Sequence, residues 1–289
     1  MPGLALGRRG LTLVELLVAM ALLGVVSTGI YGVLVSSQRT SHAQAQRIDL
    51  QQNLRAAASL LPAELRELDA SEGDIAALSP TSMTIRAMRQ LAIVCRRPAL
   101  GGALSGVGFV VRAAPFFGSR DFNPATDSLL IYYEGDEGTR QDDGWVLARL
   151  TAVGAQNCGD GTPGRRLTAN LLMPPPQWNL PGVVPNGAPV RGFEWVTYRV
   201  YQAADAQWYL GLQSGGDTQP LVGPLSGGTG LTFTYYDSAG VVTGNPAHVA
   251  EIEIVIRGIT AQPIHHAGSL STTADSLVTR VALRNNRRF

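Results

Sequence analysis

The sequence predicts an α+β protein in which one long N-terminal helix packs on a C-terminal antiparallel β-sheet body. Three observations predict it. A run of 25 residues from Leu11 to Val35 carries a single charge, Glu15. From Ser36 to Asp69 the chain has no glycine and one proline, Pro62. After that, glycine, proline and short alternating segments dominate, as is typical of strands joined by turns.

The apolar run is long enough to cross a bilayer, because ~20 helical residues at ~1.5 Å per residue cover its ~30 Å hydrocarbon core. Arg8 and Arg9 precede it and place that end in the cytoplasm by the positive-inside rule. An ionised side chain inside hydrocarbon costs at least ~2.5 kcal/mol, so we expect Glu15 to have a partner. The run therefore predicts a single-pass anchor with the body outside the cytoplasm.

Residues 36–69 continue the helix as an amphipathic segment. Apolar residues recur there at spacings of three and four, a pattern that turns one stripe of the helix toward the body: Leu54, Ala58, Leu61, Leu65 and Leu68. A continuous helix from Leu11 to Leu61 would be ~75 Å long. Pro62 either begins a second helix or kinks the first.

Residues 70–289 are expected to form the body. In its most regular segment, Ile252, Ile254 and Ile256 alternate with polar residues, as in an antiparallel strand with one solvated face. The Gly- and Pro-rich segment 154–192 is expected to be a long loop that wraps a surface or carries function. The predicted strands are Ser82–Met88, Leu91–Cys95, Gly106–Val111, Ser128–Tyr133, Trp145–Leu150, Phe193–Tyr201, Gln207–Leu212, Leu231–Tyr236, Val249–Arg257 and Ser276–Leu283.

Charge and cysteine usage exclude several classes of protein. The net charge of +1, with 16% charged residues, gives no strong field to attract nucleic acid. Cys95 and Cys158 lie in no CxxC pair, which argues against a zinc ribbon or a thioredoxin-like motif. In an exported body a disulfide is the natural state of the two cysteines, and two unpaired buried thiols are the alternative.

Motifs for catalysis are missing from the sequence. No serine stands in a G-x-S-x-G elbow, and a Walker loop needs lysine, which the chain lacks. His265 and His266 are adjacent, and adjacent strand residues point to opposite faces, so we expect a solvated loop pair and no shared metal. We therefore expect no catalytic residue, no cofactor and no enzymatic activity.

Two charged clusters are expected to be solvated. The acidic turn with Asp136, Glu137, Asp142 and Asp143 could offer oxygen ligands to calcium, but its spacing does not fit an EF-hand. A solvated hairpin tip is the expected structure, and no metal site is predicted. Arg284, Arg287 and Arg288 are expected in a frayed tail, with anionic lipid or a partner as the alternative contact.

The segment Gly10-Leu-Thr-Leu-Val-Glu15, followed by an apolar helix, resembles the prepilin leader junction of type IV pilins and type II secretion pseudopilins. In that family a membrane-embedded prepilin peptidase cuts after the glycine, here Gly10, and methylates the new terminus, here Leu11, where phenylalanine is commonest. The resemblance implies a cleaved leader of residues 1–10 and a transmembrane or filament-core helix of residues 11–35. Glu15 would pair with the new amino group of a neighbouring subunit, which offsets its burial and sets register in a filament.

The second half deepens this resemblance. The segments PLVGPLSGGTGLTFTYYDSAG, VAEIEIVIRG and SLVTRVALRNNRRF are similar to the PilW group of minor pilins and to J-type pseudopilins, whereas residues 99–192 resemble them weakly. The resemblance implies a type IV pilin-like fold and a non-catalytic minor pilin that helps to initiate or cap pilus assembly. Implied partners are the prepilin peptidase, the major pilin, other minor pilins or pseudopilins, the inner-membrane assembly platform and membrane lipid.

Two alternatives stay open. A type II secretion pseudopilin would show the same features. More distantly, the chain could be an exported enzyme or binding protein with an uncleaved anchor or an ordinary signal peptide. The A-x-A pattern in HAQA, residues 42–45, lies beyond a stretch much longer than the ~7–15 apolar residues of a signal peptide. The mass of the mature terminus tests this second alternative, whereas a pilin and a pseudopilin look alike at this level.

Overall fold

The computed structural model describes residues 12–98, 104–135, 138–174, 178, 183–266 and 269–284, apart from the side chain of His266. The fold is α+β, with one long N-terminal helix and a large antiparallel sheet. The chain divides into two compact units. The first comprises Met1–Gln52 and Ile259–Asp275, and the second comprises Asn53–Gly258 and Ser276–Phe289.

Helix α1 runs without interruption from Leu13 to Leu65. Pro62 lies inside it and neither begins a second helix nor ends the first. Proline removes one backbone donor, yet helical bonding persists beyond it, since the N–H of Arg66 donates to the carbonyl of Pro62 at 3.0 Å. Leu61 and Leu65 on either side are fully buried, and this burial offsets the lost bond.

The first unit combines α1 up to Gln52 with a hairpin of β13 (Ile264–His266) and β14 (Ser269–Ser271). The backbone N–H of Gln262 donates to Oε1 of Gln46 at 3.0 Å. His265 and His266 lie on β13, not on the predicted loop, because His265 pairs with Leu270 across the hairpin.

The second unit contains an antiparallel sheet, here called the body sheet. Its strands, in spatial order, are β1 (Ile75–Leu78), β2 (Ser82–Arg96), β8 (Pro189–Gln202), β9 (Trp208–Ser214), β10 (Asp217–Leu225), β12 (Glu251–Ile259) and β11 (Leu231–Tyr236), with β15 (Ala274–Ala282) also paired to β12. A short 3-10 helix, η2 (Pro246–His248), precedes β12.

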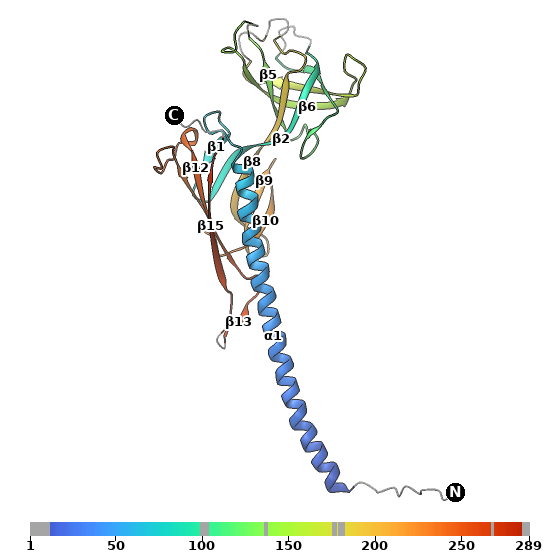
Figure 1. Ribbon diagram of the computed structural model, residues 1–289, viewed down its shortest axis with the longest axis vertical. Coiled ribbons are helices and arrows are strands. Elements are labelled where there is room, and N and C mark those ends of the chain that lie inside the picture. Colours follow the sequence, from blue (N-terminus) through green and yellow to red (C-terminus); the bar gives the residue numbers. More distant parts are fainter. Residues whose placement is uncertain are drawn as a thin grey trace, which may run out of the picture. The chain divides into compact units, whose positions relative to one another are not determined.

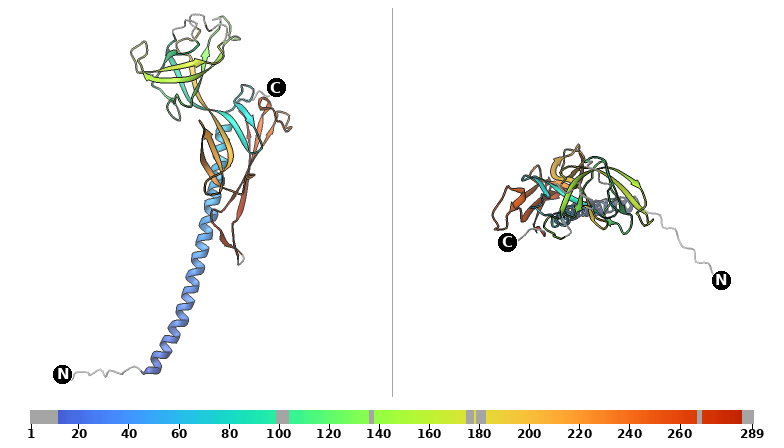
Figure 2. Two further views of the ribbon diagram at one scale, coloured as in Figure 1. Left: turned by 180° about the vertical axis from the view of Figure 1, so that it is seen from behind. Right: turned by 90° about the horizontal axis from the view of Figure 1, so that it is seen from above.

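The end of α1 covers the buried face of this sheet. Figures 1 and 2 show that part of the helix beside β8, β9 and β10, and Nδ2 of Asn53 donates to the carbonyl of Gly223 at 2.8 Å. Ile252, Ile254 and Ile256 are fully buried while Glu251 and Glu253 are not. The alternation that predicted a half-solvated strand is thus confirmed.

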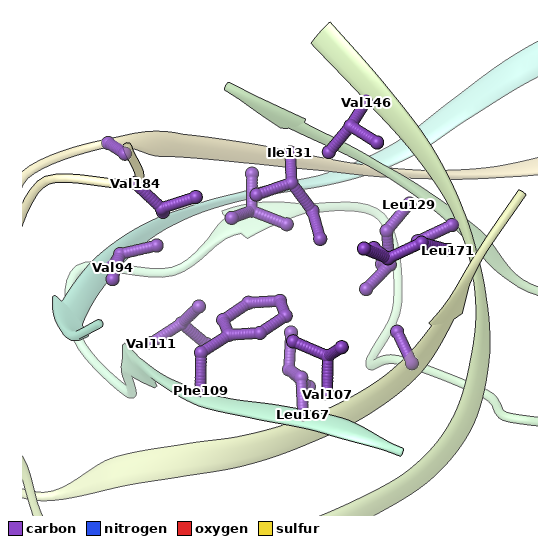
Figure 3. Packing of buried hydrophobic residues seen from close by; sticks show 14 of the residues in the cluster. Val94, Val107, Phe109, Val111, Leu129, Ile131, Val146, Leu167, Leu171 and Val184 are labelled. Carbon is purple, nitrogen blue, oxygen red and sulfur yellow. The ribbon is translucent and has the colours of Figure 1, made fainter. Parts of the chain in front are cut away.

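A six-stranded barrel adjoins the body sheet in the same unit, and the sequence did not predict it. Its strands pair in the ring β2, β3, β7, β6, β5, β8, and the ring closes because β8 pairs with both β5 and β2. The additional strands are β3 (Val107–Arg112), β5 (Ser128–Tyr133), β6 (Gly144–Ala155) and β7 (Gly164–Leu171), and a short β4 (Phe117–Gly118) pairs with β2. Figure 3 shows its apolar interior, where Phe109, Ile131 and Leu167 meet.

Strands β2 and β8 belong to both structures. Residues 82–88 of β2 pair with residues 193–199 of β8 in the body sheet, and residues 91–93 pair with residues 189–191 in the barrel. The register shifts between Met88 and Gln90, where the two parts meet. The barrel is therefore an insertion between the outer ends of two long strands, and it occupies the region that resembled the pilin family weakly.

The segment 154–192 is not one long loop. It contains β7, in which Leu167, Ala169 and Leu171 point into the barrel, together with the ends of β6 and β8. The expectation of a loop was wrong because the flanking glycines and prolines hid a short alternating strand that needs partners far away in sequence.

Candidate functional site

The first half of α1 is apolar on every side. Its exposed large apolar side chains, which run from Leu13 to Leu34, have exposed fractions between 51% and 77%. Its most apolar 18-residue window has a mean hydropathy of 2.2 with no part buried. Among the helices that the structure describes, α1 is the one long and apolar enough to cross a membrane. A helix that is apolar all round needs a bilayer or other helices to cover it.

Glu15 caps this helix through Thr12. Its Oε2 accepts hydrogen bonds from the backbone N–H and from the hydroxyl of Thr12, each at 3.1 Å. The backbone N–H of Glu15 donates to Oγ1 of Thr12 at 3.3 Å. This is a capping box, which satisfies free donors of the first turn. The Thr-x-x-Glu spacing is typical of a capping box, although Glu15 was predicted only to have a charged partner.

The capping box does not give Glu15 the charged partner that the sequence predicted for it. Thr12 gives the carboxylate two donors but no opposite charge, and no ion pair involves Glu15 within the ranges that the structure covers. Gly10 and Leu11, the predicted processing site, lie outside the described residues. The pairing of Glu15 with the amino group of another subunit therefore stays a prediction.

Three glycines interrupt the exposed helix. A Cβ added at Gly24, Gly29 or Gly32 would meet no described atom within 4 Å, so none of the described residues requires glycine there. The Thr28 hydroxyl donates to the Gly24 carbonyl and satisfies its own polar group inside the helix. Small residues at such positions let another helix approach closely.

A buried ionic network lies where α1, the body sheet and the barrel meet. Arg89 follows Met88 at the register shift of β2, and its guanidinium contacts two carboxylates. Its Nη1 lies 2.8 Å from Oε1 of Glu64 on α1, and its Nε lies 2.6 Å from Oε1 of Glu194 on β8. The side chains of Arg89 and Glu194 are each 12% exposed.

The network continues into the barrel through Arg120. Its Nη2 lies 3.4 Å from Oε2 of Glu194 and 2.5 Å from Oδ1 of Asp127, whose side chain is fully buried. Asp127 also accepts from Nε2 of Gln90 at 3.2 Å and from the backbone N–H of Asn123 at 2.8 Å. Charges and donors thus link helix, sheet and barrel without leaving Asp127 uncompensated.

The network shifts the pKa values of Glu194 and Arg89. Burial alone would raise the pKa of Glu194, but hydrogen bonds from Arg89 and Ser214 and the charges of Arg89 and Arg120 outweigh it, so its pKa is lowered. Burial acts against the positive charge of Arg89, yet hydrogen bonds to Glu194 and Glu64 raise the pKa of the guanidinium. Both shifts favour the charged forms of Glu194 and Arg89.

The acidic turn holds its own hairpin together. Asp136 and Glu137 lie outside the described residues. The hydroxyl of Tyr132 donates to Oδ2 of Asp143 at 2.7 Å, a bond that raises the pKa of Tyr132 to about 12. The hydroxyl of Thr139 donates to Oδ1 of Asp142 at 3.1 Å. No group of three or more His, Cys, Asp or Glu side chains suited to a metal occurs in the described part of the chain.

The two cysteines form a disulfide. Cys95 and Cys158 are 63 positions apart in sequence and 5.4 Å apart between Cα atoms. The bond links the end of β2 to the segment after β6, so it fastens two parts of the barrel.

Arg284 is not part of a frayed tail. Its backbone N–H donates to the carbonyl of Arg66 at 2.8 Å, and its Nη1 lies 3.4 Å from Oε1 of Glu67. Both side chains are more than half exposed, so the ion pair contributes little. Arg287 and Arg288 lie outside the described residues.

Comparison with known proteins places one motif on this chain. Residues 6–31 match the family model described as the prokaryotic N-terminal methylation motif. No curated protein and no solved structure matches the chain. The motif implies processing by a prepilin peptidase and assembly with pilus components, and together with the apolar helix it supports a type IV pilin-like protein with a single-pass anchor.

Proposed function

We propose that the protein is a minor pilin of a type IV pilus system, a non-catalytic subunit that helps to initiate or cap the filament. One observation carries the proposal: an N-terminal methylation motif leads directly into a helix that is apolar and exposed on all sides. Such a helix can be stored in the inner membrane and later packed among other helices in a filament, with the body outside the cytoplasm.

The barrel favours a low-copy position over a repeating one. It adds a second core to the body, built from the inserted strands β3, β5, β6 and β7 together with the ends of β2 and β8. Subunits that repeat along a shaft must pack side by side, and a bulky insertion makes that packing harder. A place at the tip or in the initiating complex tolerates the extra volume. The PilW-like segments at the C-terminal end agree with a minor subunit.

Glu15 is proposed as the assembly residue. Cleavage after Gly10 would create an amino group at Leu11, and methylation keeps that group positively charged. Opposite charges in a low-dielectric setting attract strongly, and the pairing offsets the cost of burying both. The partners are the major pilin and the other minor pilins, which carry the same helix.

The mature N-terminus tests the processing step. We expect mass spectrometry of the protein from its native host to show a chain that begins at N-methylated Leu11. A chain that retains Met1, or one that begins after Ala45, would refute the proposal and would favour a membrane-anchored or secreted enzyme or binding protein.

Substitutions at Glu15 separate the cap from the charge. Glutamine can replace glutamate in a capping box but carries no charge, so Glu15→Gln keeps the cap and removes the pairing. We expect Glu15→Gln and Glu15→Ala to abolish incorporation into sheared pili, with unchanged amounts in the membrane. Normal incorporation of Glu15→Gln would refute the pairing.

Deletion of the whole gene is expected to reduce piliation. If the deletion instead stops secretion of folded exoproteins and leaves pili intact, the protein is a pseudopilin.

A further inference from the structure

One outer face of the barrel gathers three arginines. Arg96 at the end of β2 pairs with Val110 on β3, and Val110 pairs with Arg166 on β7. Arg96 and Arg166 therefore flank Val110 across three adjacent strands. Val110 is only 2% exposed. It does not belong to the barrel core, which contains its neighbours Phe109 and Val111. Its side chain is thus covered on the outside of the barrel, where arginine stems can lie over it.

These arginines surround a hollow of about 200 Å³, which is lined by Arg96, Arg97, Gly108, Phe109, Val110, Gln156 and Arg166. Gly108 makes room for the charge. A Cβ at that position would lie 3.0 Å from Nη2 of Arg166, so an alanine there would displace the guanidinium from its place.

The three guanidinium groups have no carboxylate partner in the part of the chain that the structure describes. Other arginines nearby do. Arg112 pairs with Asp160 at 3.0 Å, and Arg165 pairs with Asp121. The contrast is local, since the chain as a whole has a net charge of only +1.

The disulfide holds the walls of the hollow together. Cys95 precedes Arg96, and Cys158 follows Gln156 by two positions. The backbone N–H of Arg97 also donates to Oδ1 of Asn186 at 3.1 Å. Fixed walls matter because a preorganised site loses less conformational entropy on binding than a loose one.

We propose that Arg96, Arg97 and Arg166 form a binding site for the phosphate group of a ligand. The planar fork of a guanidinium matches phosphate oxygens in pairs, and three arginines line the hollow. This site is independent of the proposed role in pilus assembly, because it lies on the barrel and uses no residue of the N-terminal helix.

The test is isothermal titration of the full-length protein in nonionic detergent at low ionic strength, with inorganic phosphate and inorganic pyrophosphate as probes. We expect one site per chain. Arg166→Ala should weaken binding at least tenfold, which corresponds to the loss of one charge-assisted hydrogen bond. Arg166→Lys should restore only part of it, because lysine keeps the charge but lacks the fork. Gly108→Ala should weaken binding while every charge remains.

Arg199→Ala is the matched control, because Arg199 lies on the body sheet and is bonded to Gln213 at 3.3 Å. It should bind like the wild type. Binding of neither probe, or equal weakening by Arg199→Ala and Arg166→Ala, would overturn the proposal. Tighter binding of pyrophosphate would indicate a diphosphate or polyphosphate ligand, and equal binding a single phosphate monoester. An unchanged unfolding temperature of each variant excludes misfolding as the cause.

Discussion

Arg89→Met tests whether the ionic network stabilises the junction of helix, sheet and barrel. Methionine keeps most of the apolar stem and removes the guanidinium, so Glu64 and Glu194 lose their shared counter-charge. Removal of one partner from a buried pair costs ~3–5 kcal/mol. Glu64 is 28% exposed and can regain water, while Glu194 keeps the Arg120 guanidinium at 3.4 Å and the Ser214 hydroxyl at 2.8 Å. We therefore expect the lower end, ~3 kcal/mol.

Thermal unfolding followed by tryptophan fluorescence is the assay. The signal reports on the second unit alone, even when the apolar helix stays in detergent, because all of the tryptophans belong to that unit: Trp145, Trp178, Trp195 and Trp208. For a domain of ~150–250 residues, ~1 kcal/mol corresponds to ~2–4 °C, so the expected fall is ~6–12 °C.

Arg280→Met is the control, since Arg280 is 58% exposed in its pair with Glu253 and a surface pair contributes little to stability. In a double-mutant cycle, Glu64→Gln should cost less in the Arg89→Met background than in the wild type. The reasoning is refuted if Arg89→Met lowers the unfolding temperature no more than the control does.

Three further predictions concern the same unit. Because the pKa of Glu194 is lowered on folding, its stabilisation is complete above the usual pKa near 4.5 and is lost as pH falls through the lower pKa of the folded state. Glu194→Gln should therefore flatten the dependence of unfolding temperature on pH below about 5, and an unchanged slope would contradict this. Reduction of Cys95–Cys158, which are 63 positions apart, should cost ~4 kcal/mol by loop entropy, and dithiothreitol should not affect a double serine variant. Gly192→Ala places a Cβ against Gln90 and Phe122 and should cost ~1–3 kcal/mol, whereas Gly154→Ala, with open space, should stay within ~0.5 kcal/mol in urea unfolding.

Elements whose sequence pattern lies within the element and its flanking turns could be predicted from the sequence. The apolar run fixed the start of α1 to within two residues of the structure. Strands Ser128–Tyr133 and Leu231–Tyr236 coincide with β5 and β11, because turn residues bound each of them on both sides. β10 was missed because Pro220 and Pro224 interrupt it, and proline argues against a regular strand.

Strand β2 shows where local patterns mislead. The sequence predicted two strands, 82–88 and 91–95, because Arg89 and Gln90 break the apolar alternation. The structure has one strand of 15 residues. The polar residues fit because Arg89 binds two carboxylates and Gln90 donates to Asp127, and none of these partners is near them in sequence.

The candidate sites also differ in how close their residues lie in the sequence. The cap of Glu15 rests on a residue three positions away, so the sequence alone could have revealed it. The arginine face could not be predicted, because Arg96 and Arg166 become neighbours only when β3 pairs with both β2 and β7. Closure of the barrel depends on such distant pairings throughout, and no periodicity in a single strand encodes them.

The barrel can be added to the body because β2 and β8 continue past the sheet. Each strand keeps its partner across the register shift at Met88 and Gln90, and ring closure leaves the inserted strands with few free edges. Assembly through the helix and binding on the barrel then draw on separate residues. Distant changes usually add without interaction, so Glu15→Gln should block assembly without altering phosphate affinity, and Arg166→Ala should do the reverse. A loss of both functions in either variant would show that the barrel takes part in assembly.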